Sequence, residues 1–178
     1  LEEPRPLMVF VLGQSNAGNH GSPIPANSEI QPALFFYKGK CYQTTGQAPG
    51  ATGLGSNLWT VLGPKLADSI GRPVMFAVLA VESTQVRDWT EPGPIRDQLL
   101  ATIADQRLQG FVPDVVFWQQ GEADAKAQTT RNKYIQRFGE LIRILRSEGI
   151  HAPIVVALST RCRNDGSIEF AGCHGIVR

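Results

Sequence analysis

The sequence predicts an α/β protein in which a central parallel sheet lies between two layers of helices, a three-layer α/β/α sandwich of flavodoxin-like type. Three observations predict it. Four short apolar runs recur along the chain, amphipathic helical patterns separate them, and Gly or Pro marks the segment ends. Continuous apolar runs are typical of strands buried on both faces, and strands that alternate with helices form parallel sheets.

The first half of the chain contains one strand, a long loop and one helix before the next strand. Residues 7–12 form the first apolar run, and a Gly- and Pro-rich stretch follows, with a short hairpin expected at 33–42. Leu62, Leu66 and Ile70 then repeat at helical spacing. Pro64 predicts that this helix begins near Gly63, because proline is tolerated in a first helical turn and not further inside.

The second half repeats the order of strand and helix. Strands are expected at 74–81, 114–118 and 154–158. Two amphipathic helices lie between them, the first ending at Gly110 and the second, the longest of the chain, before Gly149. The pattern contains no internal repeat, so we expect a single domain over residues 1–178.

Composition excludes several classes of protein. The chain has 178 residues, 42% hydrophobic and 19% charged, which excludes a disordered protein. Its formal net charge is +1 with no clustered basic run, so we expect neither a nucleic-acid partner nor an anionic membrane surface. No apolar stretch approaches the ~20 residues that cross a bilayer. Its three cysteines form no C-x-x-C pair, and no cluster has the spacing of metal ligands, so no metal site is expected.

The sequence leaves the state of Cys162 and Cys173, either a disulfide or two free thiols, open. They flank a polar loop that a disulfide could close in an oxidising compartment, or they remain two free thiols.

Polar residues concentrate directly after each predicted strand, at the edge where open parallel sheets bind ligands. The four segments are 13–18, 82–89, 119–124 and 159–162. In the first of them Ser15 lies in a Gly-flanked turn, which exposes its hydroxyl and directs nearby N–H groups at a developing anion. The pattern therefore predicts that Ser15 is a nucleophile or, alternatively, the N-cap of a following helix.

Two other readings of this turn fit less well. A phosphate-binding loop would need a Lys followed by Ser or Thr, which is absent here. A nucleophile elbow of the G-x-S-x-G type would need Gly at position 17, where the chain has Ala17, and that elbow lies later in its fold.

Two motifs together resemble the SGNH hydrolase superfamily. Residues 13–18 read Gly-Gln-Ser-Asn-Ala-Gly and residues 118–124 read Trp-Gln-Gln-Gly-Glu-Ala-Asp. In this combination they are similar to the sialate O-acetylesterase and acetylxylan esterase branch, carbohydrate esterase family 6. Residues 84–89 also resemble the Gly-Gly-Thr block of that branch, so the resemblance extends over essentially the whole chain. It implies a serine esterase that removes O-acetyl groups from a carbohydrate through an acyl-serine intermediate, without a cofactor.

The resemblance also implies roles for individual residues. Ser15 would be the nucleophile, and Glu122 would orient a catalytic histidine or position substrate. The oxyanion hole would consist of the Ser15 N–H, an N–H near Ser83 and the Gln120 side-chain amide. The residues expected to contact substrate are Gln14, Asn16, Thr84 and Trp89, and Tyr37 is a further aromatic residue suited to stacking on a sugar. Asp124 is expected to be an acid at a helix N-terminus rather than a catalytic group.

Two departures from the family pattern bear on activity. Glu82 and Ser83 stand where the branch has paired glycines, and a non-glycine residue would be strained there if the backbone needs a positive φ. The Asp-x-x-His block that supplies the catalytic base is also missing from the 178 residues. We therefore expect that the chain lacks the C-terminal segment carrying this base. The histidines present are His20, on a loop near Ser15, His151, before the last strand, and His174.

The sequence thus predicts a carbohydrate O-acetylesterase, with an acetylated carbohydrate as its partner. A catalytically inactive carbohydrate-binding module on the same scaffold is the alternative. A nucleotide-binding protein of flavodoxin-like topology is a third possibility, although the uncharged turn at residues 13–18 offers no cation to a phosphate.

Overall fold

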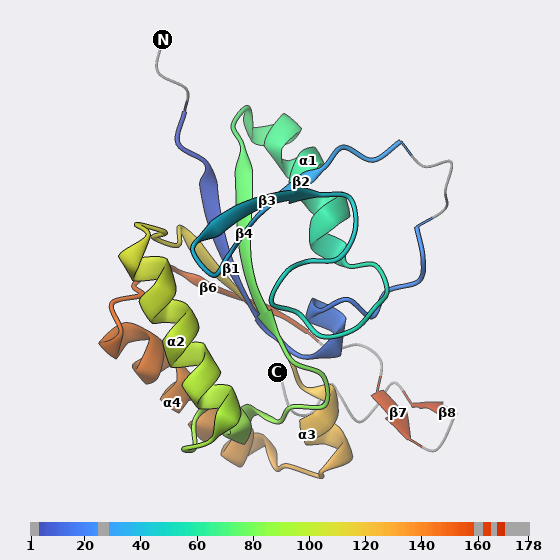
Figure 1. Cartoon of the computed structure of the whole chain (residues 1–178). Coiled ribbons are helices and arrows are strands. Elements are labelled where there is room, and N and C mark those ends of the chain that lie inside the picture. Colours follow the sequence, from blue (N-terminus) through green and yellow to red (C-terminus); the bar gives the residue numbers. More distant parts are fainter. Residues whose placement is uncertain (1–3, 25–28, 159–161, 165–166, 170–178) are drawn as a thin grey trace.

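A computed structural model of the chain describes residues 4–24, 29–158, 162–164 and 167–169. A six-stranded sheet of order β3-β2-β4-β1-β5-β6 forms its centre, with helices on both faces (Figure 1). The strands are β1 (Leu7–Gly13), β2 (Ala33–Tyr37), β3 (Lys40–Thr44), β4 (Val74–Ala80), β5 (Val115–Gln119) and β6 (Ile154–Ala157). Every neighbouring pair is parallel except β2 and β3. The α/β/α sandwich is confirmed, and its sheet is mixed at one edge rather than parallel throughout.

The predicted hairpin is present, but its first strand is also part of the main sheet. β2 pairs with β3 in antiparallel register and with β4 in parallel register. Phe35 and Phe36 point to opposite faces of β2 and both are buried, as expected for a strand inside a sheet.

The helices follow the predicted order. They are α1 (Leu58–Ile70), α2 (Pro94–Leu108), α3 (Glu122–Lys126) and α4 (Arg131–Ser147). Single 3-10 turns, η1 (Ser15–Ala17) and η2 (Val86–Trp89), follow β1 and β4. A separate two-stranded sheet consists of β7 (Cys162–Asn164) and β8 (Ser167–Glu169).

The predicted start of α1 was wrong, because the helix begins five residues earlier than Gly63 and contains Pro64 in its interior. Two features support the extra turn. The Asn57 side chain accepts a hydrogen bond from the Thr60 N–H and caps the helix, and Trp59 is fully buried. The cap and the buried indole together outweigh the backbone hydrogen bond that Pro64 removes.

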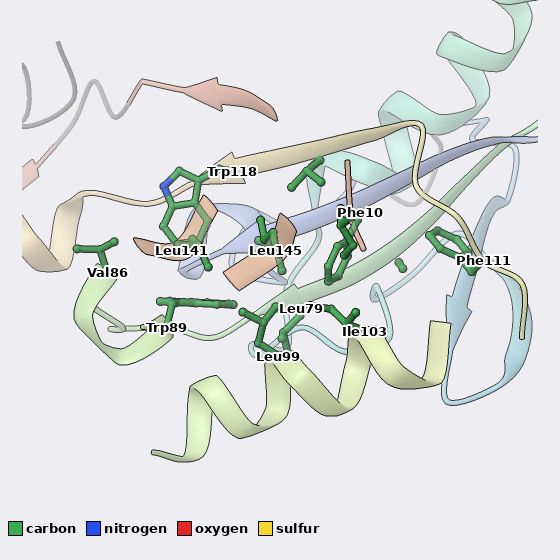
Figure 2. Packing of buried hydrophobic residues seen from close by; sticks show 14 of the residues in the cluster. Phe10, Leu79, Val86, Trp89, Leu99, Ile103, Phe111, Trp118, Leu141 and Leu145 are labelled. Carbon is green, nitrogen blue, oxygen red and sulfur yellow. The ribbon is translucent and has the colours of Figure 1, made fainter. Parts of the chain in front are cut away.

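Alternate residues of the central strands build two separate cores. Val9 and Val11 of β1 face α1, whereas Phe10 and Leu12 face the layer of α2 and α4. Figure 2 shows the second core, in which Leu99 and Ile103 of α2 are directed at the strand residues above them. Because apolar residues on both faces fix the register of β1, the point at which this strand ends is also fixed, and Ser15 follows directly after it.

Candidate active site

The ends of β1 and β5 lie in direct contact at the edge of the sheet. The Gln14 N–H donates to the Gln119 carbonyl at 3.0 Å. Gly13 makes this approach possible, because a Cβ at that position would lie 2.1 Å from the Gln119 oxygen. The close contact brings the turn that contains Ser15 beside the start of α3, which contains Glu122.

An open cavity of about 550 Å³ lies at this edge. The segments after β1 and β4, together with α3 and its C-cap, contribute its lining residues, which are Gln14, Ser15, Ser83, Gln85, Glu122, Ala123, Lys126 and Ala127. Ser15, Ser83 and Glu122, which the sequence singled out from three distant segments, therefore share one cavity.

Ser15 is half-buried and is the first residue of η1. Its side chain caps no helix, because Gln14 holds the N-cap position, so the reading of Ser15 as a helix cap is wrong. Within the described part of the chain the Ser15 N–H donates to no backbone carbonyl, as expected at the start of a turn. The residue thus offers both a hydroxyl and a free N–H donor beside the cavity.

Ser83 adopts a left-handed backbone conformation with φ +60°. This conformation normally costs a non-glycine residue about 1–2 kcal/mol. The sequence predicted backbone strain if a non-glycine residue replaced one of the paired glycines, and Ser83 shows this strain. Ser83 is exposed and lines the same cavity as Ser15.

Two neutral amides hold the Glu122 carboxylate. Asn16 Nδ2 donates to Glu122 Oε1 at 2.5 Å, and Gln119 Nε2 donates to the same oxygen at 2.9 Å. Glu122 Oε2 is buried and has no hydrogen-bond partner among the described residues. The carboxylate is therefore fixed in place through one oxygen, while the other is buried without a partner among the described residues.

Gln120 is fully buried and does not line the cavity. Its Nε2 lies 2.7 Å from Asp124 Oδ2, 2.9 Å from the Thr84 carbonyl and 3.3 Å from Gln14 Oε1. An amide nitrogen has only two hydrogens, so these acceptors already occupy its donor capacity. The structure thus corrects the prediction that Gln120 donates directly to an oxyanion. It braces the loops on which Ser15 and Ser83 lie.

Asp124 is the centre of this bracing network and is fully buried. Its Oδ2 also accepts from the Val86 N–H at 2.7 Å, so the acid joins α3 to the turn that follows Ser83. The expectation of a simple acid at a helix N-terminus misses this connection.

Tyr134 extends the network from α4. Its hydroxyl accepts from Trp118 Nε1 at 3.1 Å and donates to the Gln120 carbonyl at 3.2 Å. Burial raises the pKa of Tyr134, and the nearby carboxylates of Asp124 and Glu122 raise it further, against the effect of the hydrogen bond from Trp118. Tyr134 consequently remains a protonated donor at physiological pH.

Two of the four residues predicted to contact substrate lie inside the protein instead. Trp89 is fully buried and packs edge-on against Trp118, with ring centroids 5.4 Å apart (Figure 2). Thr84 is buried, donates to the Val81 carbonyl and accepts from Trp89 Nε1. Neither side chain lines the cavity, so the predicted contacts of Thr84 and Trp89 with substrate are corrected to packing roles. Gln14 does line it, and Asn16 holds Glu122.

No described histidine lines the cavity. His20 Nε2 lies 3.6 Å from Glu82 Oε2 and 3.3 Å from Thr52 Oγ1. His151 precedes β6 and so lies at the opposite edge of the sheet. His174 lies outside the described residues, as does the pairing of Cys162 with Cys173.

Sequence reasoning missed Gln85 and Lys126 among the lining residues. Lys126 is the only cation in that lining, and among the described residues no carboxylate lies within ion-pair distance of it. The available signal was its spacing, because Lys126 follows Glu122 by one helical turn and therefore lies on the same face of α3.

The described residues contain no group of three or more His, Cys, Asp or Glu side chains that could hold a metal ion. None of their helices is both long and apolar enough to cross a membrane.

A mostly parallel sheet between two helical layers, with a serine in the turn after its first central strand, defines a hydrolase fold of the SGNH type. The family model for carbohydrate esterases, described as sialic acid-specific acetylesterase, matches residues 6–167. The chain belongs to this family. It is therefore a carboxylic ester hydrolase of the carbohydrate esterase type.

Solved structures support the same fold. A protein from Arabidopsis thaliana is 16% identical, with a TM-score of 0.69 and coverage of 88% of this chain and 76% of its own. NanS is 16% identical, with a TM-score of 0.60 and coverage of 88% and 68%. A carbohydrate acetylesterase from Xanthomonas citri is 19% identical, with a TM-score of 0.56 and coverage of 86% and 41%. Among curated proteins, none matches the chain.

Proposed function

We propose that the protein is a serine esterase in which Ser15 attacks the acetyl ester of a sugar. The observation that carries this proposal is the shared cavity, in which Ser15, Ser83 and Glu122 meet at the carboxyl ends of the strands. Ligands of open α/β sheets bind at this edge, and a serine at the start of a tight turn there is accessible to an ester.

The reaction consists of two acyl transfers. Ser15 Oγ attacks the ester carbonyl carbon and loses its proton to a base, and the carbonyl oxygen becomes an oxyanion. The sugar oxygen leaves with a proton from the protonated base, and the acetyl group stays on Ser15. The base then removes a proton from water, which attacks the acetyl carbon of the acetyl-serine. The bond between that carbon and Ser15 Oγ breaks, the base returns the proton to Oγ, and acetate leaves.

The oxyanion would receive its hydrogen bonds from the backbone. The Ser15 N–H is free of backbone partners among the described residues, and Ser83 lines the same cavity. Backbone donors of this kind are fixed before the reaction and so stabilise the charge that develops in the transition state. Gln120 contributes indirectly by holding the Thr84 carbonyl and the Gln14 side chain.

The base that we propose is an imidazole from outside the described residues. His20 is paired with Glu82, and His151 lies at the other edge of the sheet, so neither is placed to serve Ser15. Glu122 alone is a poor substitute, because a carboxylate is a weak base toward a serine hydroxyl. Its unpartnered Oε2 is suited to orient such an imidazole or a substrate hydroxyl.

The cavity favours an acidic sugar, of the sialate type, over a neutral sugar such as xylose. Lys126 places an ammonium group in the lining, and among the described residues no carboxylate lies within ion-pair distance of it. A carboxylate on the sugar would pair with this ammonium while its acetyl ester lies near Ser15.

Labelling with a fluorophosphonate probe tests the nucleophile, since the probe reacts with an activated serine. Peptide mapping by mass spectrometry should locate the adduct on Ser15, and acetyl ester hydrolysis should disappear with it. The exposed Ser69 of α1 is the internal control and should remain unmodified. Absence of a Ser15 adduct, together with intact sugar binding, would favour the second candidate function, an inactive carbohydrate-binding module.

A further inference from the structure

A second cavity, separate from the one that contains Ser15, lies between α2 and the β2–β3 hairpin. It has a volume of about 230 Å³ and shares no lining residue with the first. Phe36, Ala77 and Ala101 contribute apolar surface, and Lys38 and Asp105 contribute charged groups. Gln106 also lines the cavity, with its amide atoms buried.

Gln106 is the unusual residue in this lining. It is only 2% exposed, and neither its amide oxygen nor its amide nitrogen has a hydrogen-bond partner among the described residues. A buried amide without partners is costly, because it has lost its hydrogen bonds to water and gained none in return. Leucine or methionine at position 106 would avoid this cost, since Gln106 is buried on the helix that contributes Leu99 and Ile103 to the hydrophobic core. Turning the amide into the adjoining cavity would let an occupant supply the missing partners.

The turn between β2 and β3, which borders this cavity, has an unfavourable backbone conformation at Lys38. Lys38 and Gly39 both have positive φ, +48° and +70°, although lysine rarely adopts that conformation. The Gly39 N–H donates to Asp105 Oδ2 at 3.0 Å and ties the turn to α2. The Lys38 ammonium lies 5.2 Å from the centroid of the Tyr37 ring, with no carboxylate of the described residues within ion-pair distance.

We propose that this cavity binds one sugar unit of a glycan. A pyranose ring combines an apolar C–H face with hydroxyl groups that both donate and accept. The C–H face would pack on Phe36 and Ala77, and a vicinal hydroxyl pair would satisfy the Gln106 amide. Asp105 and Lys38 offer an acceptor and a donor to the remaining hydroxyls. Binding here is independent of the chemistry at Ser15, so the cavity is an accessory binding site and not part of the catalytic centre.

Isotope-labelled protein titrated with xylobiose, and separately with N-acetylneuraminic acid, tests the proposal by NMR. Neither sugar contains an O-acetyl ester, so hydrolysis does not interfere. Saturable shifts of backbone signals in the hairpin turn at 38–39 and in α2 at 98–106 are expected with at least one sugar, and equally in the Ser15→Ala variant. Shifts confined to the Ser15 cavity, or no saturation up to about 50 mM, would overturn the proposal.

Two variants assign the shifts to the cavity. Ala101→Phe places a ring in the space that the sugar would fill, and its exposed position on α2 makes folding the expected outcome. Gln106→Met removes the amide and should weaken binding at least tenfold while raising the melting temperature.

Ser69→Phe on α1 is the matched control and should bind as the parent does. Unchanged binding in either cavity variant that retains its fold would contradict the assignment. Hydrolysis of a small acetyl ester should be unaffected in Ala101→Phe, Gln106→Met and Ser69→Phe, so failure here is distinguishable from failure of the proposed function.

Discussion

Gln120 Nε2 lies 2.7 Å from Asp124 Oδ2 in a region from which solvent is excluded, and this contact sets the orientation of the Gln120 amide. With the nitrogen facing the carboxylate, the same nitrogen also faces the Thr84 carbonyl and Gln14 Oε1. The reverse orientation would direct the amide oxygen at three acceptors. A buried acid thus holds the turn before Ser15 and the turn after Ser83 in a fixed arrangement.

Asp124→Asn should lower kcat by about tenfold to a hundredfold and leave KM nearly unchanged. The asparagine oxygen can still accept from both Gln120 and Val86, but it is neutral, so both hydrogen bonds weaken. The new NH2 group takes the place of the buried, unpartnered Oδ1, and the two turns are held less firmly. Steady-state kinetics on a small acetyl ester measure the effect. The exposed Asp97→Asn on α2 is the control. A loss confined to thermal stability, with kcat retained, would make Asp124 purely structural.

Ser83→Gly should stabilise the fold by about 1 kcal/mol, because glycine adopts the left-handed conformation of position 83 without the steric cost of a Cβ. For a chain of this size the melting temperature should rise by about 2–4 °C. Differential scanning calorimetry measures the change. The same substitution at Ser69 in helix α1 should destabilise the protein, since glycine is unfavourable inside a helix. A lower melting temperature for Ser83→Gly would mean that the serine side chain compensates for the strain.

Most of the fold was predictable, because buried parallel strands and amphipathic helices leave strong local patterns. The start of α1 was not, since the cap at Asn57 and the burial of Trp59 depend on contacts that Pro64 conceals in the sequence. The place of β2 in the main sheet was missed for a related reason. Its pairing with β4 joins segments about forty residues apart, and short apolar runs do not specify their partners.

The site was predictable as a set of strand-end segments, but the direction of each side chain was not. Ser15 and Glu122 line the cavity as expected, whereas Trp89 turns into the core against Trp118. Gln120 lies behind the cavity for the same kind of reason, because the buried carboxylate of Asp124 attracts its amide. Motif spacing places a residue on a loop, and only packing decides which way it points.

Asp114→Asn should destabilise the protein at neutral pH. Burial acts to raise the pKa of Asp114, but the Met8 N–H, the hydrogen bond from Arg5 and the charges of Arg5 and Arg72 together lower it below its ordinary value of 3.8. A lowered pKa contributes stability that is present above the unfolded value and is lost as the pH falls through the folded value. Urea unfolding at pH 7 and at pH 3 should therefore show a difference from the parent that shrinks in acid. An equal difference at both pH values would contradict the linkage.

Ser15→Ala should abolish hydrolysis of acetyl esters and leave the melting temperature nearly unchanged. The alanine side chain lacks the attacking oxygen, and the Ser15 side chain caps no helix whose loss would destabilise the fold. Release of acetate, followed together with the thermal melt, measures both effects. His20→Gln is the companion variant and should retain most of its activity, because His20 is paired with Glu82 and does not line the cavity. Activity that survives in Ser15→Ala would remove this serine from the mechanism, and activity lost in His20→Gln would make His20 the base.

Lys126→Met should raise KM for an O-acetylated acidic sugar and leave KM for an acetylated neutral sugar unchanged. The methionine keeps the apolar stem of the lysine but removes the one positive charge in the cavity lining. Because Lys126 is exposed, solvent screening limits the effect to about two- to fivefold. Salt should reduce the difference between parent and variant, since it screens the same attraction. Lys133→Met, an exposed residue of the first turn of α4, is the control and should behave as the parent does. An equal rise in KM for both sugars would assign Lys126 to general packing of the substrate and not to recognition of a carboxylate.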